Sequence, residues 1–394
     1  MGAGLFGSAY GWPGHSGPAG TIEPVGDAEE VLENGQPANG APALCGLSTL
    51  QLEELAVELG EKPFRGRQLS QWIYAKFAKD FSEMRDLPKA FRDALAERFS
   101  LDGIETADHK TSRDGVEKLL VHKGDGQVYE CVLLPYRDRV SCCLSSQVGC
   151  PMGCTFCATG LGGFDRNLTA SEMVAQYVTL QRLSPRRISH VVFMGMGEPL
   201  LNLDNLLKAM TVLHDEVGLS YRHITVSTVG LVPQIRKLAE IDLPIHLALS
   251  LHSPFDAVRD KLMPVNHKWP VAEVVGAMKQ YGKATGRKIT FEYLLIDSLN
   301  DTDEQAEALA KLVRGVPAVV NLIPFNWVDT GHGLARPSQE RIIKFRTILE
   351  SRGINVTERV ERGHDIAAAC GQLAGQHVGR FANRRTLSQL PSAP

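Results

Sequence analysis

Three cysteines occupy one short stretch with a spacing that suits iron–sulfur chemistry. Cys150, Cys154 and Cys157 follow one another as C-x3-C-x2-C. Thiolates are the soft ligands that iron–sulfur clusters and zinc prefer. A structural zinc site needs four ligands in paired spacing, and no fourth Cys or His follows directly. Three thiolates on a four-iron cluster leave one iron open to a small molecule. The loop therefore predicts one [4Fe-4S] cluster, with zinc as the alternative.

Strand-like segments alternate with helix-like runs over the middle of the chain, and they would position this loop. Repeated βα units imply parallel strands with the helices outside. Six strands are fewer than the eight of a full barrel. We therefore expect an α/β fold with a partial (β/α)6 TIM-type barrel. The six segments that read as barrel strands are 140–147, 190–195, 223–228, 245–251, 289–296 and 319–325.

Further polar and glycine residues fall at the carboxyl ends of these predicted strands. In barrels of this type the chemistry occurs at that end, because the loops there converge on one rim. The cysteine loop follows the first strand, and the segment Gly-Met-Gly-Glu-Pro at 195–199 follows the second. The rim therefore predicts a binding site next to the cysteines. Its candidate binding residues are Gly197, Glu198, Ser227, Ser250, Leu251, His252 and Asn326.

Composition divides the rest of the chain. A Gly/Pro/Ala-rich start without periodicity predicts a disordered extension over 1–44. Residues 45–105 predict a small helical domain, and 106–135 predict a strand-rich connector to the barrel at 136–350. The final region, 351–394, predicts a C-terminal extension with a basic tail.

The predicted helical domain begins with a capping-box pattern at Ser48 and Gln51. A basic and aromatic run follows, and such a face suits RNA. The alternative is that its aromatic residues are core while its basic residues are solvated. The run contains Arg65, Arg67, Trp72, Tyr74, Lys76 and Lys79.

The composition and charge of the chain argue against a membrane protein, a secreted protein and a disulfide-rich protein. The formal net charge is −3, so overall charge gives no sign of nucleic-acid binding. No apolar run approaches the roughly 18 residues of a membrane span, and the start lacks a secretory signal pattern. Eight cysteines in such a chain favour metal or thiol chemistry over a disulfide framework. We expect a cytoplasmic, monomeric protein with no membrane partner.

From residue 45 to about 385 the chain resembles the RlmN family of RNA adenine-C2 methyltransferases, within the radical S-adenosylmethionine (SAM) superfamily. The resemblance implies that the open iron chelates SAM and that the rim residues contact it. It also implies two SAM molecules per turnover and an electron donor such as flavodoxin or ferredoxin. The matching segments are GEKPFRGRQ, SSQVGCPMGCTFCATG, FDRNLT, MGMGEPLLN, STVGLVP, ALSLHSP, FEYLLIDSLND, NLIPFN and RGHDIAAACGQLAG.

The same resemblance assigns three catalytic residues. Cys370 matches the cysteine that first receives a methyl group and then carries it as a thiomethylene radical to the base. Cys143 matches the cysteine that resolves the covalent adduct through a transient disulfide. Its neighbour Cys142 would point to the opposite face of a strand. Glu130 matches the base that removes the proton from carbon 2.

The implied substrate is an adenosine of 23S rRNA at the peptidyl-transferase centre, and some family members also modify adenosine 37 of tRNAs. Three alternatives stay open. The chain could methylate carbon 8, like the related Cfr-type enzymes. It could be a radical SAM enzyme with a small-molecule substrate. It could also be an iron–sulfur electron carrier or RNA-binding module without catalysis.

Overall fold

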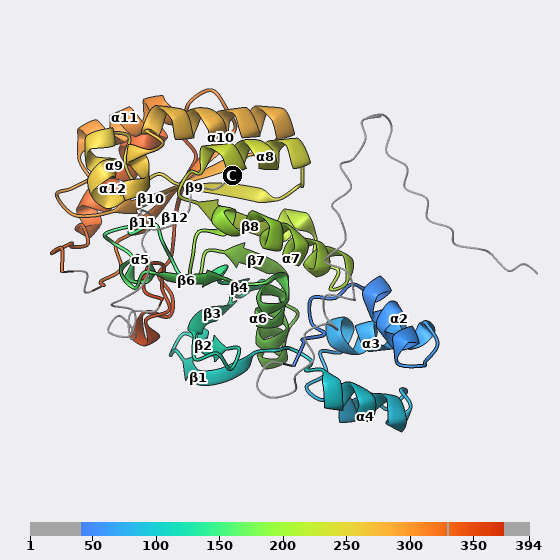
Figure 1. Cartoon of the computed structure of the whole chain (residues 1–394). Coiled ribbons are helices and arrows are strands. Elements are labelled where there is room, and N and C mark those ends of the chain that lie inside the picture. Colours follow the sequence, from blue (N-terminus) through green and yellow to red (C-terminus); the bar gives the residue numbers. More distant parts are fainter. Residues whose placement is uncertain (1–40, 329–330, 374–394) are drawn as a thin grey trace, which may run out of the picture.

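A computed structural model describes residues 41–328 and 331–373. Most of the predicted N-terminal extension and the predicted basic tail lie outside these residues. Within them, a ten-stranded sheet carries helices on its outer face (Figure 1). No described helix is both long and apolar enough to cross a lipid bilayer.

The sheet is a parallel barrel wall extended by an antiparallel segment. Its strand order is β1-β2-β3-β4-β7-β8-β9-β10-β11-β12. The first three strands pair antiparallel, and all pairs from β4 to β12 are parallel. The strands are β1 (Glu105–Thr111), β2 (Glu117–His122), β3 (Val128–Pro135), β4 (Val140–Cys143), β7 (His190–Phe193), β8 (Ile224–Thr228), β9 (His246–Ser250), β10 (Ile289–Leu295), β11 (Ala318–Pro324) and β12 (Val356–Glu358). A separate hairpin pairs β5 (Gln147–Gly149) with β6 (Phe164–Asn167).

All six predicted barrel strands are present and parallel, which confirms the partial barrel. The predicted series stopped one strand short, because β12 adds a seventh parallel strand beside β11. Amphipathic helices cover the wall, with their apolar sides against the buried strands. These helices are α6 (Ala170–Leu183), α7 (Leu203–Asp215), α8 (Val232–Ile241), α9 (Asp256–Leu262), α10 (Val271–Thr285), α11 (Asp303–Val313) and α12 (Gln339–Ser351). The short α5 (Ala158–Leu161) directly follows the cysteine loop. Single helical turns lie at η3 (Pro199–Asn202), η4 (Tyr221–His223), η5 (Pro264–His267) and η6 (His364–Ile366).

A group of short helices lies beside α6 and α7 (Figure 1). Ser48 caps the first of them, and Gln51 completes the predicted capping box. The backbone amide of Thr49 donates to the Glu216 carboxylate at 2.9 Å, just after α7. This polar contact ties the helical group to the barrel. The group contains α2 (Thr49–Glu58), α3 (Phe64–Ser70), η1 (Gln71–Ala75), η2 (Phe81–Glu83) and α4 (Lys89–Arg98).

The segment after β12 crosses the opening between the two ends of the barrel wall. Its Arg362 pairs with Asp114 at 3.2 Å, and its Asp365 accepts a hydrogen bond from Ser112. The Nζ of Lys118 on β2 donates to the carbonyl of Ala367 at 3.0 Å. We call residues 359–373 the closing segment, because these contacts join β12 to the antiparallel strands.

Candidate active site

A cavity of about 970 Å³ lies at the carboxyl ends of the parallel strands. This volume falls in the range of about 300–1,000 Å³ that is usual for ligand pockets. We call it the cluster cavity, because all three cysteines of the predicted cluster line it. The other predicted site residues that line it are Gly197, Glu198, Ser227, Ser250, His252, Asn326 and Cys370.

The cysteine loop is held by backbone contacts on both sides. The amide of Cys150 donates to the Gly163 carbonyl at 2.6 Å, and the amide of Thr155 donates to the Leu262 carbonyl at 3.0 Å. Burial and the neighbouring thiols raise the pKa of Cys150 and of Cys154. Metal ligation needs thiolates, and the positive charge of a bound cluster would offset the cost of ionising these buried thiols.

The donor set fits a cluster with one open iron. Within the described residues, no three Cys, His, Asp or Glu side chains converge as ligands of a single metal ion would. The three cysteines instead occupy one loop on the lining, and the rest of the cavity is free to hold SAM.

Gly197 and Glu198 form a tight turn at the cavity wall. Gly197 has φ of +101°, and a Cβ there would lie 2.5 Å from the Cβ of Gln147, so only glycine fits. The Glu198 carboxylate accepts hydrogen bonds from the amides of Leu200 at 3.0 Å and Val229 at 2.8 Å. Burial raises the pKa of Glu198 to about 7, although these amides lower it. Glu198 therefore fixes the loop after β8 and presents a buried carboxyl group to the cavity.

His252 is a neutral, buried imidazole. Burial and, to a smaller extent, the Arg259 guanidinium lower its pKa to about 3. Its Nδ1 accepts the backbone N–H of Leu294 at 3.0 Å, so the proton is on Nε2. Its φ of +58° is unusual for a residue with a side chain. Such local strain is typical of functional sites.

Of the remaining predicted rim residues, Ser227, Ser250 and Asn326 line the cluster cavity and Leu251 does not. The hydroxyls of Ser227 and Ser250 lie 3.4 Å apart across β8 and β9. The Asn326 side chain donates to the Cys370 carbonyl at 3.3 Å, which links the cavity to the closing segment. Leu251 does not line the cavity, because its side chain is fully buried in the core. The prediction that Leu251 contacts SAM could therefore hold only for its backbone.

Arg259 is a site residue that the sequence reasoning missed. It is fully buried, and its guanidinium donates to the carbonyls of Leu251 at 3.1 Å and Val229 at 2.6 Å. Burial lowers its pKa to about 10, so it stays cationic at neutral pH. It joins the loops after β8 and β9 and so shapes one wall of the cavity. It also donates to the Asn266 side chain at 2.8 Å. Contacts to backbone carbonyls leave no sequence signal.

A second cavity of about 760 Å³ brings the two predicted catalytic cysteines together. We call it the cysteine cavity. Cys143 and Cys370 both line it, together with Cys157, Asn326 and Arg359. Burial raises the pKa of Cys143 to about 12 and also raises that of Cys370, while Arg359 lowers both. Cys142, in contrast, is buried away from this lining, as strand alternation predicted. All eight cysteines are free thiols.

Glu130 lies on β3 outside the lining of both cavities. Its carboxylate pairs with Lys118 Nζ at 3.0 Å, and both side chains are buried. Lys118 also contacts Ala367, three residues before Cys370. In this arrangement Glu130 supports the closing segment, and its role as the base stays a prediction.

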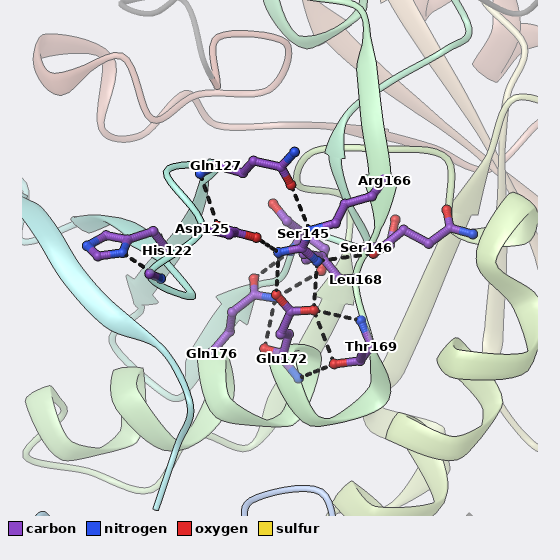
Figure 2. Close-up of polar contacts among 12 residues, drawn as sticks. His122, Asp125, Gln127, Ser145, Ser146, Arg166, Leu168, Thr169, Glu172 and Gln176 are labelled. Atoms are coloured by element: carbon purple, nitrogen blue, oxygen red, sulfur yellow. Dashed lines mark hydrogen bonds and ion pairs between the residues drawn. The ribbon is translucent and has the colours of Figure 1, made fainter. Parts of the chain in front are cut away.

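Arg166 anchors the β5–β6 hairpin that carries the cysteine loop (Figure 2). Its guanidinium makes two parallel hydrogen bonds to Glu172 on α6, at 2.9 and 2.8 Å. It also pairs with Asp125 at 2.8 Å and donates to Gln127 at 2.7 Å, both in the turn before β3. Burial lowers the pKa of Arg166, but the two carboxylates raise it by more, so the net shift is upward. This network shows how Arg166 holds the hairpin, and with it the cysteine loop, in place (Figure 2).

We expect Arg166→Ala to destabilise the fold by about 3 kcal/mol, because it leaves the buried Glu172 carboxylate without its cation. Urea unfolding measures this cost. Arg346→Ala is the matched control, since Arg346 pairs only with Glu350 in an exposed i,i+4 contact and its loss should change little. Equal urea midpoints for the two variants would contradict the anchoring role.

Comparisons with known proteins agree with this geometry. Residues 144–313 match the model of the radical SAM superfamily, and residues 43–101 match that of a ribosomal RNA large subunit methyltransferase N-terminal domain. A probable dual-specificity RNA methyltransferase RlmN of Symbiobacterium thermophilum is 49% identical over 86% of this chain and 94% of its own length. The dual-specificity RNA methyltransferase RlmN of an Anaeromyxobacter species is 46% identical over 89% of this chain and 96% of its own.

This chain belongs to the RlmN family of radical SAM proteins. The crystal structure of a radical SAM methyltransferase from Sphaerobacter thermophilus superposes with a TM-score of 0.82 at 45% identity, covering 84% of this chain and 99% of that one. The RlmN-family assignment also implies SAM and a [4Fe-4S] cluster as cofactors. The cluster cavity fits both, because three adjacent thiols line it together with the side chains of Glu198, Ser227, Ser250, His252 and Asn326.

Proposed function

We propose that this chain methylates carbon 2 of an adenosine in 23S rRNA at the peptidyl-transferase centre, with adenosine 37 of tRNAs as a second substrate. The observation that carries the proposal is that Cys143 and Cys370 line one cavity that shares Cys157 and Asn326 with the cluster cavity. A two-cysteine transfer needs this adjacency. The names of the relatives, which describe RNA methyltransferases of dual specificity, support the substrate class.

The target carbon explains why such a site is needed. Carbon 2 of adenine lies between two ring nitrogens and is electron-poor, so direct attack on the SAM methyl group would be very slow. Bound SAM and the reduced cluster would supply the methyl group and a 5′-deoxyadenosyl radical. Cys370 would receive the methyl group from one SAM and lose a hydrogen atom from it to the radical from a second. The resulting carbon radical on Cys370 can add to carbon 2.

The second cysteine, Cys143, would release the product. The Cys143 thiolate would attack the Cys370 sulfur, so that an S–S bond forms while the bond between that sulfur and the product carbon breaks. Arg359 lines the same cavity and lowers the pKa of both thiols, which favours the attacking thiolate. The adduct radical must also lose one electron, which the oxidised cluster would take back, and a proton must leave carbon 2. The electron pair left on the product carbon then takes up a proton, which completes the methyl group. We retain Glu130 as the candidate base, and it would have to reach the base directly or through a water.

The direct test uses the reconstituted, reduced protein with SAM and a fragment of 23S rRNA, followed by mass spectrometry of the nucleosides. We expect 2-methyladenosine, and the same product from tRNA. Formation of 8-methyladenosine instead would reverse the choice of carbon. Absence of 5′-deoxyadenosine would favour the electron-carrier or RNA-binding alternative. Flavodoxin or ferredoxin is the expected electron donor, and we expect a monomer acting in the cytoplasm.

A further inference from the structure

The inside of the barrel is lined in layers from one end of the strands to the other. Alternate residues of a strand face the same side, so Ser141 and Cys143 share one column on β4. On β7 the column runs from His190 through Val192 to Met194. Ser141 pairs with His190 in the parallel register, so these two begin neighbouring columns. The lumen therefore has an amino-terminal layer below the cysteines as well as the carboxyl-terminal rim.

A third cavity opens at this amino-terminal layer, and we call it the basal cavity. It encloses about 970 Å³, and no Asp or Glu is among the described residues that line it. It lies at the starts of β4, β7, β8 and β9, which is the end opposite to the cluster cavity. Its basic lining residues are Arg139, His190, Arg222, His223, His246 and Arg359.

Arginine side chains supply the positive charge of this cavity. The rings of His190 and His223 stack with centroids 4.3 Å apart. Burial lowers the pKa of His190, and His223 and Arg139 lower it further, as close cations do. Arg139 has Asp138 as a partner at 3.2 Å, whereas no carboxylate of the described chain forms an ion pair with the exposed Arg222. Arg222 is therefore the cation of this cavity that is best able to meet an external anion.

Two more arginines, Arg186 and Arg187, lie in the loop before β7. Arg186 donates to the carbonyls of Tyr136 and Arg139, and Arg187 donates to the carbonyl of Val217. Hydrogen bonds to carbonyls orient these cations without neutralising them. The basal end of the barrel thus gathers several arginines and histidines, of which Arg139 is paired with Asp138.

One residue connects this end to the catalytic cysteines. Arg359 lines the basal, cysteine and cluster cavities. Leu134 and Tyr136 line both the basal and the cysteine cavity, so the two adjoin. Ser141 and Cys143 are two residues apart on one strand, a rise of about 7 Å. If the basal end binds the anionic group of a ligand, the part of the ligand next to that group could lie beside Cys143.

We propose that the basal cavity binds a backbone phosphate of the RNA substrate next to the target adenosine, with Arg222 as its main contact. This proposal rests on the proposed function. Guanidinium groups bind phosphate oxygens through charge-assisted, paired hydrogen bonds. An enzyme that acts on a base must draw the nucleotide out of its stack, so it needs a grip on the adjoining backbone. The basal cavity offers this grip within reach of the two cysteines.

The test compares RNA binding by the holoenzyme and its Arg222→Ala variant over a range of salt concentrations. We expect the Kd for the rRNA fragment to rise about tenfold, the usual effect of losing one charge-assisted contact. The slope of log K against log salt should become shallower by about 0.7, the value for one phosphate on a single strand. Arg222→Lys should restore the slope, because it keeps the charge. Arg346→Ala, which removes an exposed arginine on α12, should change neither quantity.

Two results would overturn the proposal. One is an unchanged Kd and salt slope for Arg222→Ala in a protein whose thermal unfolding matches the parent. The other is a site for free ions only, in which inorganic phosphate shifts the NMR signals of His190 and His223 while RNA affinity does not depend on Arg222. The proposed function fails separately, if the parent protein itself forms no methylated adenosine.

Discussion

Replacing Cys143 with alanine should leave the protein covalently joined to its RNA. Cys370 can still receive a methyl group and add to the base, but the other thiol of this cavity, Cys157, is a predicted cluster ligand and so is not free to break the bond to its sulfur. We expect a protein–RNA species that accumulates in cells and survives denaturing gels. Digestion with ribonuclease should leave a protein that carries a single nucleotide, and mass spectrometry can locate this nucleotide on Cys370.

Cys142→Ala is the matched control for this experiment. Cys142 is the adjacent residue on β4, is also buried and does not line the cysteine cavity. This variant should release its product and form no adduct. If the Cys143 variant forms no adduct although its Cys370 is methylated, the resolving role of Cys143 is wrong.

Replacing Cys370 with alanine should abolish RNA methylation. The methyl group then has no sulfur to carry it, and the direct polar route to carbon 2 is very slow, so we expect a loss of at least about a thousandfold, or about 4 kcal/mol in the activation barrier. Mass spectrometry of the RNA measures the product. The fold should persist, because Cys370 lies at the edge of two cavities and not in the core.

Cys45→Ala provides the comparison for the Cys370 variant. Cys45 is a fully buried thiol of the helical region and lines neither cavity. This change should cost some stability and leave methylation intact. Continued turnover by the Cys370 variant would instead point to a radical SAM enzyme with a different chemistry.

The sequence predicted the parts of the fold that carry a local pattern. The six barrel strands are short apolar runs between helical runs, and all six form. β12 escaped prediction, because a strand of three residues, Val356–Glu358, has no detectable period. The Ser48 cap was predicted correctly, because its hydrogen bonds lie within one turn of the helix.

The site shows the same division between local and distant signals. Cysteine spacing and rim residues follow from the chain order, and the structure gathers all but Leu251 and Glu130 of the predicted set around two adjoining cavities. Arg259 and Lys118 were missed, because they donate hydrogen bonds to carbonyls of residues that are distant in sequence. No pattern of residue types can show which backbone oxygens a buried cation will meet.

The central claim is that the methyl group reaches the RNA by way of Cys370. SAM with a trideuterated methyl group tests it most directly. Transfer through Cys370 removes one deuterium atom before the carbon–carbon bond forms, and a hydrogen replaces it on release. The two-cysteine mechanism therefore predicts 2-methyladenosine whose methyl group carries two deuterium atoms. A product that retains all three would mean direct transfer from SAM and would contradict it.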